Sequence, residues 1–185
     1  MVDRADRNTP RFPRTEKAEN IARELIREAL AKETAESEVS LCIAGGACGG
    51  DILFHEICEE QQIGGRLMLA LPQDLFQVTS VQHGAGRWVE RYHRLCSRLN
   101  PTVLQYSETM PNWLAEKKDY DIWQRNNLWM MFTALTYHAT NLTLIALYNP
   151  DVDPDGPGGT AHLVEEAKSW GIKPVPLDAR KLLEA

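Results

Sequence analysis

The stretch LCIAGGACGGDILFHEICEE, Leu41–Glu60, decides the predicted fold. Its apolar start predicts a buried strand that ends at Ala44. A turn with four glycines in six residues follows: Gly45, Gly46, Gly49 and Gly50. Asp51 then opens a predicted helix. Because glycine lets a backbone approach phosphate closely and a helix N-terminus attracts anions, the stretch predicts an anion site. The alternative is an ordinary strand-to-helix turn.

Size and composition limit what the chain can be. Its 185 residues predict one domain, spanning 1–185, with a full core. A net charge of −6 argues against a general nucleic-acid binder, so we expect no nucleic-acid partner. No apolar run is long enough to span a bilayer and no signal peptide is recognisable. We therefore expect a cytoplasmic protein with no membrane partner.

The four cysteines lack any CxxC spacing. Cys42, Cys58 and Cys96 fall on apolar faces, which predicts buried thiols of a cytoplasmic protein. Cys48 lies inside the glycine turn, and we expect it to be more exposed than the other three.

Helices and strands alternate along the chain. The predicted strands cover 39–44, 66–71, 102–106, 142–148 and 173–176, and the predicted helices cover 16–34, 51–62, 85–99, 120–138 and 160–170. Residues 1–14 are expected to form an extended arm, and residues 73–84 a long loop. The alternation predicts a three-layer, Rossmann-like α/β fold, with a mostly parallel sheet and helices on both faces.

The predicted helix over 120–138 is apolar nearly all round from Leu128 to Phe132. A helix that is apolar on every side must be buried on every side. Either this helix is central in the domain or it forms a subunit interface. We therefore expect a homo-oligomer, most simply a dimer.

A second glycine turn, Gly156–Thr160, precedes the helix over 160–170. Parallel α/β sheets bind ligands beyond the carboxyl ends of their strands, and both turns lie at that edge. The first turns of two other helices bring arginines there, whose planar forks suit phosphate. The candidate phosphate-binding residues are Gly45, Gly46, Gly49, Gly50, Asp51, Arg87, Arg91, Arg125, Asn126, Gly158, Gly159 and Thr160.

The pair of turns resembles the SLOG superfamily, which gathers the LOG-type "lysine decarboxylase-like" phosphoribohydrolases and the DprA-type Rossmann proteins. The LOG pattern is a first glycine-rich turn followed by PGGxGTxxE at the start of a late helix. Here Gly45–Gly50 matches the first part and Pro157–Thr160 the second. The likeness covers the chain from the first helix onward and is closest to SLOG-like domains of signalling and conflict systems. It implies a nucleotide or nucleotide derivative as the ligand.

The chain departs from that pattern in two places. The catalytic glutamate of the LOG pattern lies three residues after the threonine, where this chain has Leu163, and the turn is one residue shorter. SLOG-like domains also begin with a strand whose end lines the site, and this chain opens where that strand should be over. We expect that strand to be missing or supplied otherwise, which exposes a sheet edge and favours oligomerisation.

Three functions follow from these patterns. The leading hypothesis is a module that binds a nucleotide-like small molecule and acts as a sensor. The second is an enzyme that cleaves an N-glycosidic bond in a nucleotide, with a carboxylate from Glu56, Glu90 or Glu165. The third is an oligomerising scaffold with a vestigial pocket.

Three smaller features complete the predicted site. His55 and Glu59 are spaced like part of an HExxH zinc motif, but no third ligand is recognisable, so we expect no metal and no cofactor. His55 is expected at the rim of the site or in solvent. Asp51 is expected to cap its helix, and the acidic run 151–155 is expected to form a loop.

Overall fold

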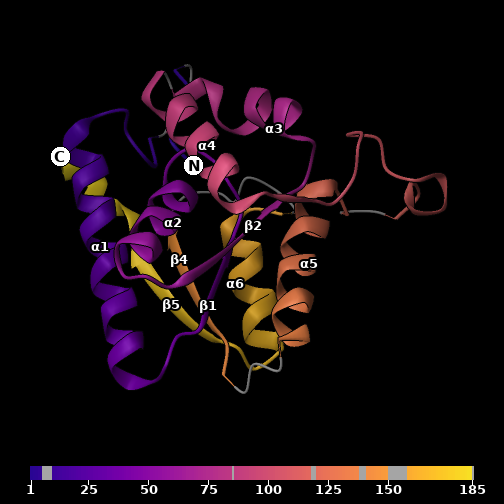
Figure 1. The fold of residues 1–185 in the computed structure, drawn as a ribbon. Coiled ribbons are helices and arrows are strands. Elements are labelled where there is room, and N and C mark those ends of the chain that lie inside the picture. The colour runs from indigo at the N-terminus through magenta and orange to yellow at the C-terminus, as the bar shows by residue number, and fades with distance from the viewer. Residues whose placement is uncertain (6–9, 85, 118–119, 138–140, 150–157, 185) are drawn as a thin grey trace.

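The computed structural model describes residues 1–5, 10–84, 86–117, 120–137, 141–149 and 158–184. Figure 1 shows the arrangement of its elements. The helices are α1 (Glu16–Glu36), α2 (Gly50–Glu60), α3 (Gln73–Ser80), α4 (Gly86–Leu99), α5 (Ile122–Thr136) and α6 (Thr160–Ser169). The strands are β1 (Leu41–Ala44), β2 (Gly64–Leu69), β3 (Thr102–Val103), β4 (Thr143–Tyr148) and β5 (Lys173–Asp178). Short 3-10 turns are η1 (Gln82–Gly84), η2 (Asn112–Leu114) and η3 (Ala179–Glu184).

Every strand pair in the described residues is parallel, which confirms the predicted α/β class. The strands form two ladders: β1, β2 and β3 in one, and β4 with β5 in the other. Leu41 lies opposite Gly64 in the first ladder, and Thr143 lies opposite Lys173 in the second. We expected one continuous sheet, whereas the described strands form two separate ladders. The ladders are joined through α1, which packs on α2 and also on β4 and β5.

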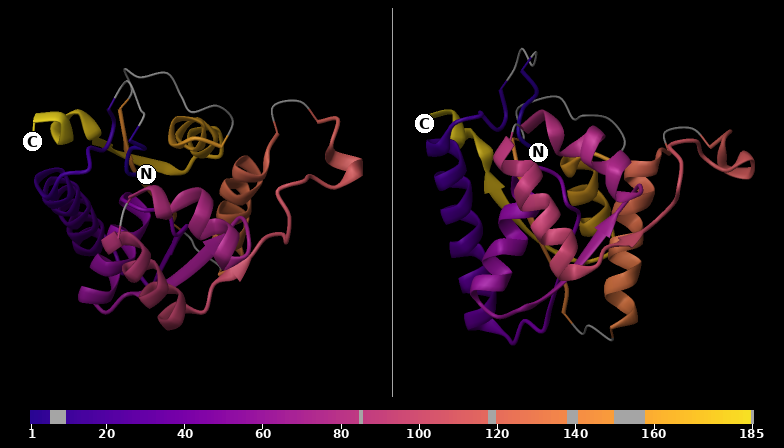
Figure 2. Two further views of the ribbon diagram at one scale, coloured as in Figure 1. Left: turned by 90° about the horizontal axis from the view of Figure 1, so that it is seen from above. Right: turned by 45° about the horizontal axis from the view of Figure 1, so that its top comes forward.

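The helices place several N-termini at one end of the molecule. Helix α2 packs on β1 and β2, α4 packs on β2, and α5 also packs on β1 and β2. Helix α6 packs on β4, β5 and α5. Both views in Figure 2 show α1 and α5 on opposite sides of the body. Because α2 and α6 each follow a parallel strand, both begin at the carboxyl edge of the strands, where such folds bind ligands.

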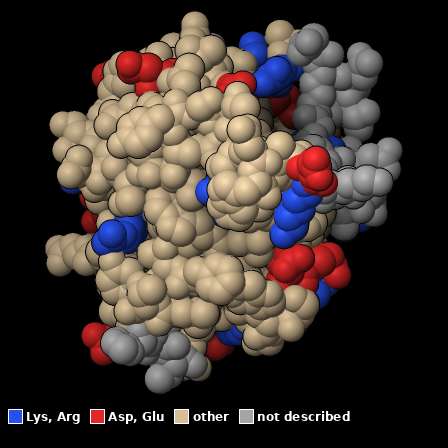
Figure 3. Space-filling view, turned by 90° about the vertical axis from the view of Figure 1, so that its right-hand side faces the viewer, with Lys and Arg blue, Asp and Glu red and all other residues tan. Residues whose placement is uncertain are grey.

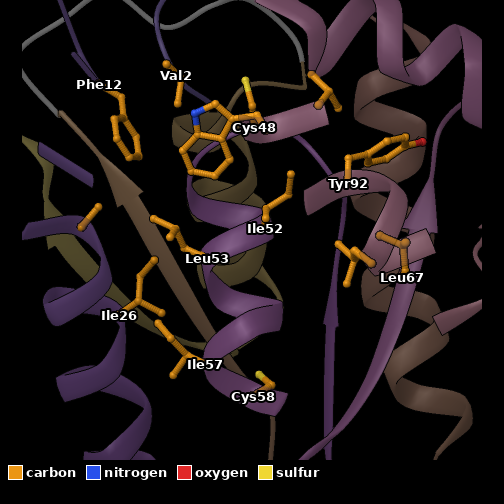
Figure 4. Packing of buried hydrophobic residues seen from close by; sticks show 14 of the residues in the cluster. Val2, Phe12, Ile26, Cys48, Ile52, Leu53, Ile57, Cys58, Leu67 and Tyr92 are labelled. Carbon is orange, nitrogen blue, oxygen red and sulfur yellow. The ribbon is translucent and has the colours of Figure 1, made fainter. Parts of the chain in front are cut away.

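The core is centred on α2. Ile52, Leu53 and Ile57 of this helix are fully buried, and Figure 4 shows them between α1 and β2. Val2 and Phe12 lie above the first turn of α2 and belong to the same buried cluster. The described parts of the N-terminal segment, residues 1–5 and 10–14, are therefore more than an extended arm, because two of their side chains complete the core.

Several predicted boundaries are wrong. Residues 73–84 form α3 and η1 rather than a loop, because Pro72 starts a helix whose Phe76 and Ser80 are buried one turn apart. The strand predicted over 102–106 is only two residues long. Most other ends move by one or two residues, which is normal for helix and strand termini. Among the described helices, none combines the length and apolar character needed to cross a membrane.

The cysteine predictions hold for three of the four residues. Cys42, Cys58 and Cys96 are free and buried. Cys48 is also fully buried, so its predicted exposure is wrong. The cause is the cover above the glycine turn: the Cys48 carbonyl accepts the Val2 N–H at 2.8 Å, and His83 Nε2 lies 3.4 Å from Cys48 Sγ. Burial raises the pKa of this thiol.

Candidate functional site

The first glycine turn is closely packed by the protein itself. A Cβ added to Gly46 would meet Leu69, Leu67 and Tyr92 at 3.1–3.2 Å. Gly49 has φ +108°, and a Cβ there would lie 3.1 Å from Phe12. Only Gly50 opens onto free space among the glycines of this turn. Gly46 and Gly49 are therefore required by packing, whatever ligand the turn binds.

Asp51 fills part of the expected anion cradle. It is the second residue of α2, whose N-cap is Gly49, so the predicted capping role is wrong. Its Oδ2 accepts the Ala47 N–H at 3.1 Å and would lie 2.6 Å from a Cβ on Gly45. Burial raises the pKa of this carboxyl. A carboxylate that already holds a donor of the turn disfavours a phosphate in the same place.

The N-terminal segment covers the same turn from above. Val2 donates its N–H to Cys48, and the Val2 carbonyl oxygen lies 3.0 Å from His83 Nε2. Asp3 Oδ2 accepts the N–H groups of Arg11 and Phe12, each at 2.8 Å. A hollow of about 210 Å³ remains beside this segment. The charged residues that line this hollow are Arg14, Glu16, Glu19 and Arg87. Because both positive and negative side chains are present, the charge of the hollow favours no single class of ligand.

His55 lies beneath the turn, and its predicted place in solvent or at the rim is wrong. The side chain is fully buried. Its Nε2 lies 3.2 Å from the Gly45 carbonyl oxygen, which accepts a hydrogen bond from the ring N–H. Burial lowers the pKa of His55 to about 4. The residue therefore supports the turn as a neutral imidazole.

The arginines of α4 are held by carboxylates. Arg91 is buried and donates to Glu56 at 2.7 and 2.6 Å and to Glu19 at 2.8 Å. Its guanidinium also lies 4.0 Å from the centre of the Trp88 ring. Arg87 is exposed and lies 3.9 Å from Glu19. These ion pairs bind Arg91 to α1 and α2 and leave it unavailable to a ligand phosphate.

The three candidate catalytic glutamates lie on three different helices, α2, α4 and α6. Glu56 pairs with Arg23, Arg91 and Arg94. Burial alone would raise the pKa of Glu56, but its arginine partners outweigh burial and lower it. Glu90 is exposed on α4. Glu165 is exposed on α6 and pairs with Lys168 at 2.9 Å.

The second glycine turn is fixed against α5. Gly158 has φ +86°, and a Cβ there would lie 2.6 Å from the Gln124 backbone nitrogen. Asn127 Nδ2 donates to the Gly158 carbonyl at 2.7 Å. Gly159 precedes α6 without a side-chain cap, and Thr160 is exposed. The first N–H groups of α6 therefore have no intrahelical partner and no side-chain cap, as at any uncapped helix start.

Polar side chains occupy two neighbouring faces at the start of α5. On the face toward α6, Gln124 Nε2 lies 3.0 Å from His162 Nε2. Gln124 Oε1 and His162 Nδ1 are buried and lack hydrogen-bond partners among the described residues. Asn126 is one turn after the core residue Ile122, on the face toward β1 and β2. It is only 5% exposed, and within the described chain its Oδ1 also has no partner.

Arg125, a predicted phosphate contact, is bonded within the chain in this structure. Its Nη1 donates to Gln105 Oε1 and lies 3.9 Å from Met110 Sδ. It therefore anchors the segment that precedes α5. In the region where the start of α5 meets the second glycine turn, the sequence predicted Arg125, Asn126 and the glycines. It missed Gln124, Asn127 and His162. Their signal was position alone, in the first turns of two helices that begin at the same edge.

Metal binding finds no support in the described residues, where no group of three or more His, Cys, Asp or Glu side chains is placed to hold an ion. The predicted acidic loop, with Asp151, Asp153 and Asp155, lies outside the described residues, as do Gly156 and Pro157 of the second turn.

Comparisons with known proteins identify no relative. No family model matches the chain, and no curated protein matches it. One solved structure, cystathionine beta-synthase from Bacillus anthracis, matches at 15% identity with a TM-score of 0.20. The match covers 88% of this chain and 65% of that one. A likeness at this level carries no argument about fold or function.

Proposed function

We propose that this protein binds a nucleotide or related phosphorylated small molecule and acts as a sensor. The ligand would lie at the carboxyl edge of the parallel strands, in contact with Asn126 of α5 and with the first N–H groups of α6. It would not lie between Gly158 and α5, because these pack directly on each other. The position agrees with the general location of ligands in parallel α/β folds. The pair of glycine turns, which resembles SLOG-type domains, supports the same ligand class.

The observation that carries the proposal is the state of Asn126. Buried polar side chains are nearly always hydrogen-bonded, and an exception needs a cause such as an ordered water or a ligand. Asn126 is buried at the ligand edge, and its Oδ1 has no partner in the described part of the chain. Leaving such an acceptor unpaired costs about 1–3 kcal/mol. A ligand donor, such as a ribose hydroxyl or a base amine, would satisfy this oxygen.

The phosphate would be held mainly by backbone. The second turn is fixed in position by Asn127 and by the contact of Gly158 with α5. The uncapped N-terminus of α6 then offers N–H groups and the positive end of a helix dipole. Arg91 and Arg125 are bonded elsewhere. This donor set favours a ligand with few phosphates over a highly charged one.

Binding without turnover is the better match to the chemistry present. The position of the LOG catalytic glutamate is occupied by Leu163. Glu56 is neutralised by three arginines, and Glu90 and Glu165 are exposed. A carboxylate in any of these states is poorly suited to stabilising an oxocarbenium-like ribose. A sensor needs none of them.

A thermal-shift screen against nucleotides and their derivatives, with each mixture analysed for released base, tests the proposal. A ligand at a hundred times its Kd should stabilise the fold by about 2.7 kcal/mol. Asn126→Leu should abolish the shift while the apo protein unfolds at an equal or higher temperature, because it removes an unpaired amide. Asn20→Leu, at an exposed position of α1, should keep the shift.

Each outcome is decisive. A shift with intact ligand supports the sensor. A shift with released base supports a hydrolase instead. Absence of any shift, or a shift that survives in folded Asn126→Leu, contradicts the proposed site.

A further inference from the structure

Helix α5 carries an apolar outer face. The helix is neither central nor fully buried: one side packs on β1 and β2, another on α6, and the outer side is open. Phe132 is 55% exposed and Leu135 is 53% exposed there. Trp170, after α6, packs its ring on Phe132 with the ring centres 4.8 Å apart. We call Phe132, Leu135 and Trp170 the α5 face.

The segment between β3 and α5, residues 104–117, projects from the same side. Figures 1 and 2 show it standing away from the body beside α5. Trp113 at its far end is 81% exposed, and Tyr106 is 85% exposed. Arg125 holds the base of the segment through Gln105 and Met110. The Trp113 indole therefore contacts little of its own chain. Because tryptophan is enriched at the hot spots of protein interfaces, such exposure indicates a contact with a partner.

The described residues on this side of the molecule include few charged side chains. Figure 3 faces it directly and shows a broad surface with only scattered Lys, Arg, Asp and Glu side chains. The chain as a whole carries a net charge of −6. Two copies would therefore repel each other least when they meet through this side.

We propose that two copies of this chain form a symmetric dimer through this side, with Trp113 of each projecting segment packed against the α5 face of the other. A two-fold interface uses the same patch on both subunits, so one patch must carry both a protrusion and the surface that receives it. The projecting segment and the α5 face meet that requirement on one side of one chain. The low charge of this side favours a second copy as the occupant. The proposal does not depend on the ligand site.

The test is the mass of the full chain in solution, measured by light scattering after gel filtration and by sedimentation across a concentration series. The unaltered chain should be a dimer. Phe132→Glu should be a monomer with an unchanged circular dichroism spectrum, because a carboxylate remains hydrated when the face is open but is desolvated in the dimer. Trp113→Ala should raise the dimer dissociation constant at least tenfold.

Leu183→Glu is the matched control. Leu183 is an exposed leucine of η3, which packs on α1 at the other side of the molecule. This variant should remain a dimer. A monomer at several hundred micromolar for the unaltered chain, a dimer for Phe132→Glu, or no effect of Trp113→Ala would each overturn the proposed interface. Loss of the dimer in Leu183→Glu would place the contact elsewhere and overturn it too.

Discussion

The two glycine turns at the carboxyl edge look alike in sequence and differ in what surrounds them. The first, Gly45–Gly50, is covered by Val2 and Phe12, and its Ala47 N–H donates to the Asp51 carboxylate. The second is fixed by Asn127 against the start of α5 and leads into an uncapped helix. Glycine in the first turn allows close packing of the protein on itself. In the second, Gly158 likewise packs closely on α5, but the first N–H groups of α6 have no side-chain cap among the described residues.

The contrast shows that a glycine-rich turn indicates close approach of some group to the backbone, without saying which group. The space around Gly46 and Gly49 is occupied by the core and the N-terminal segment. A ligand at the first turn would have to displace Phe12 or Asp51. A ligand at the second turn displaces no described side chain. Four changes test this difference, and they are ordered by the size of the expected effect.

Removing the cover of the first turn should have the largest effect. Phe12 is almost fully buried in the core cluster. Phe12→Ala should lower the free energy of unfolding by about 3–5 kcal/mol, as expected for loss of a buried phenyl ring. Urea unfolding measures this change. Leu75→Ala, at an exposed position of α3, should stay within about 0.5 kcal/mol. A loss below about 1 kcal/mol for Phe12→Ala would show that the segment does not seal the turn.

The support beneath the first turn should depend on pH. His55 has a pKa of about 4 when folded and 6.5 as a model value, so the unfolded chain binds more protons between these values. Stability conferred by the neutral imidazole is complete above about pH 6.5 and is lost as pH falls toward 4, by about 3 kcal/mol in total. Urea unfolding from pH 7.5 to 4.5 measures this slope.

His55→Gln is the variant for that experiment. A glutamine amide can still donate to the Gly45 carbonyl but does not titrate, so the slope between pH 6.5 and 4.5 should flatten. His93→Asn, at an exposed position of α4, should keep the slope. An unchanged slope in His55→Gln would mean that the imidazole is not held neutral beneath the turn.

The second turn should be rigid. Gly158 has a positive φ, and a Cβ there would meet the backbone of α5. Gly158→Ala should therefore cost about 2 kcal/mol and also weaken any ligand binding at the α6 N-terminus. Gly50→Ala at the first turn meets open space and should not lower stability, because alanine favours the helix. Equal losses of unfolding free energy in the two variants would remove the distinction between the turns.

The parallel α/β order was predictable because apolar strands and amphipathic helices alternate with clear turn residues between them. The edge that carries both glycine turns followed from that order. The occupants of the first turn were not predictable, because Phe12 and Val2 reach it from a polar stretch with no periodic pattern. The partners of Arg91 were equally hidden: Glu19 and Glu56 lie 72 and 35 residues away in sequence. Sequence pattern predicts which residues reach an edge, whereas long-range pairing decides which remain open to a ligand.

The smallest expected effect comes from the Asp51 carboxylate. Its raised pKa means that the folded protein binds the proton of this carboxyl more tightly than the unfolded chain does, so ionisation costs stability as pH rises above the ordinary value of 3.8. Asp51→Asn keeps an acceptor for the Ala47 N–H without that cost, and should raise the free energy of unfolding at pH 7. The difference in unfolding free energy between the two proteins should shrink toward pH 4.

Ligand binding in the same variant decides between the turns. If the nucleotide-like ligand lies at the second turn, Asp51→Asn should leave its Kd within about twofold, because the neutralised carboxyl is not at the site. Calorimetric titration of a ligand found in the thermal-shift screen measures this. A tenfold or greater gain in affinity would place the phosphate at the first turn, where removal of a negative charge relieves repulsion. The filled turn would then be the ligand site, and the N-terminal segment would have to move to admit the ligand.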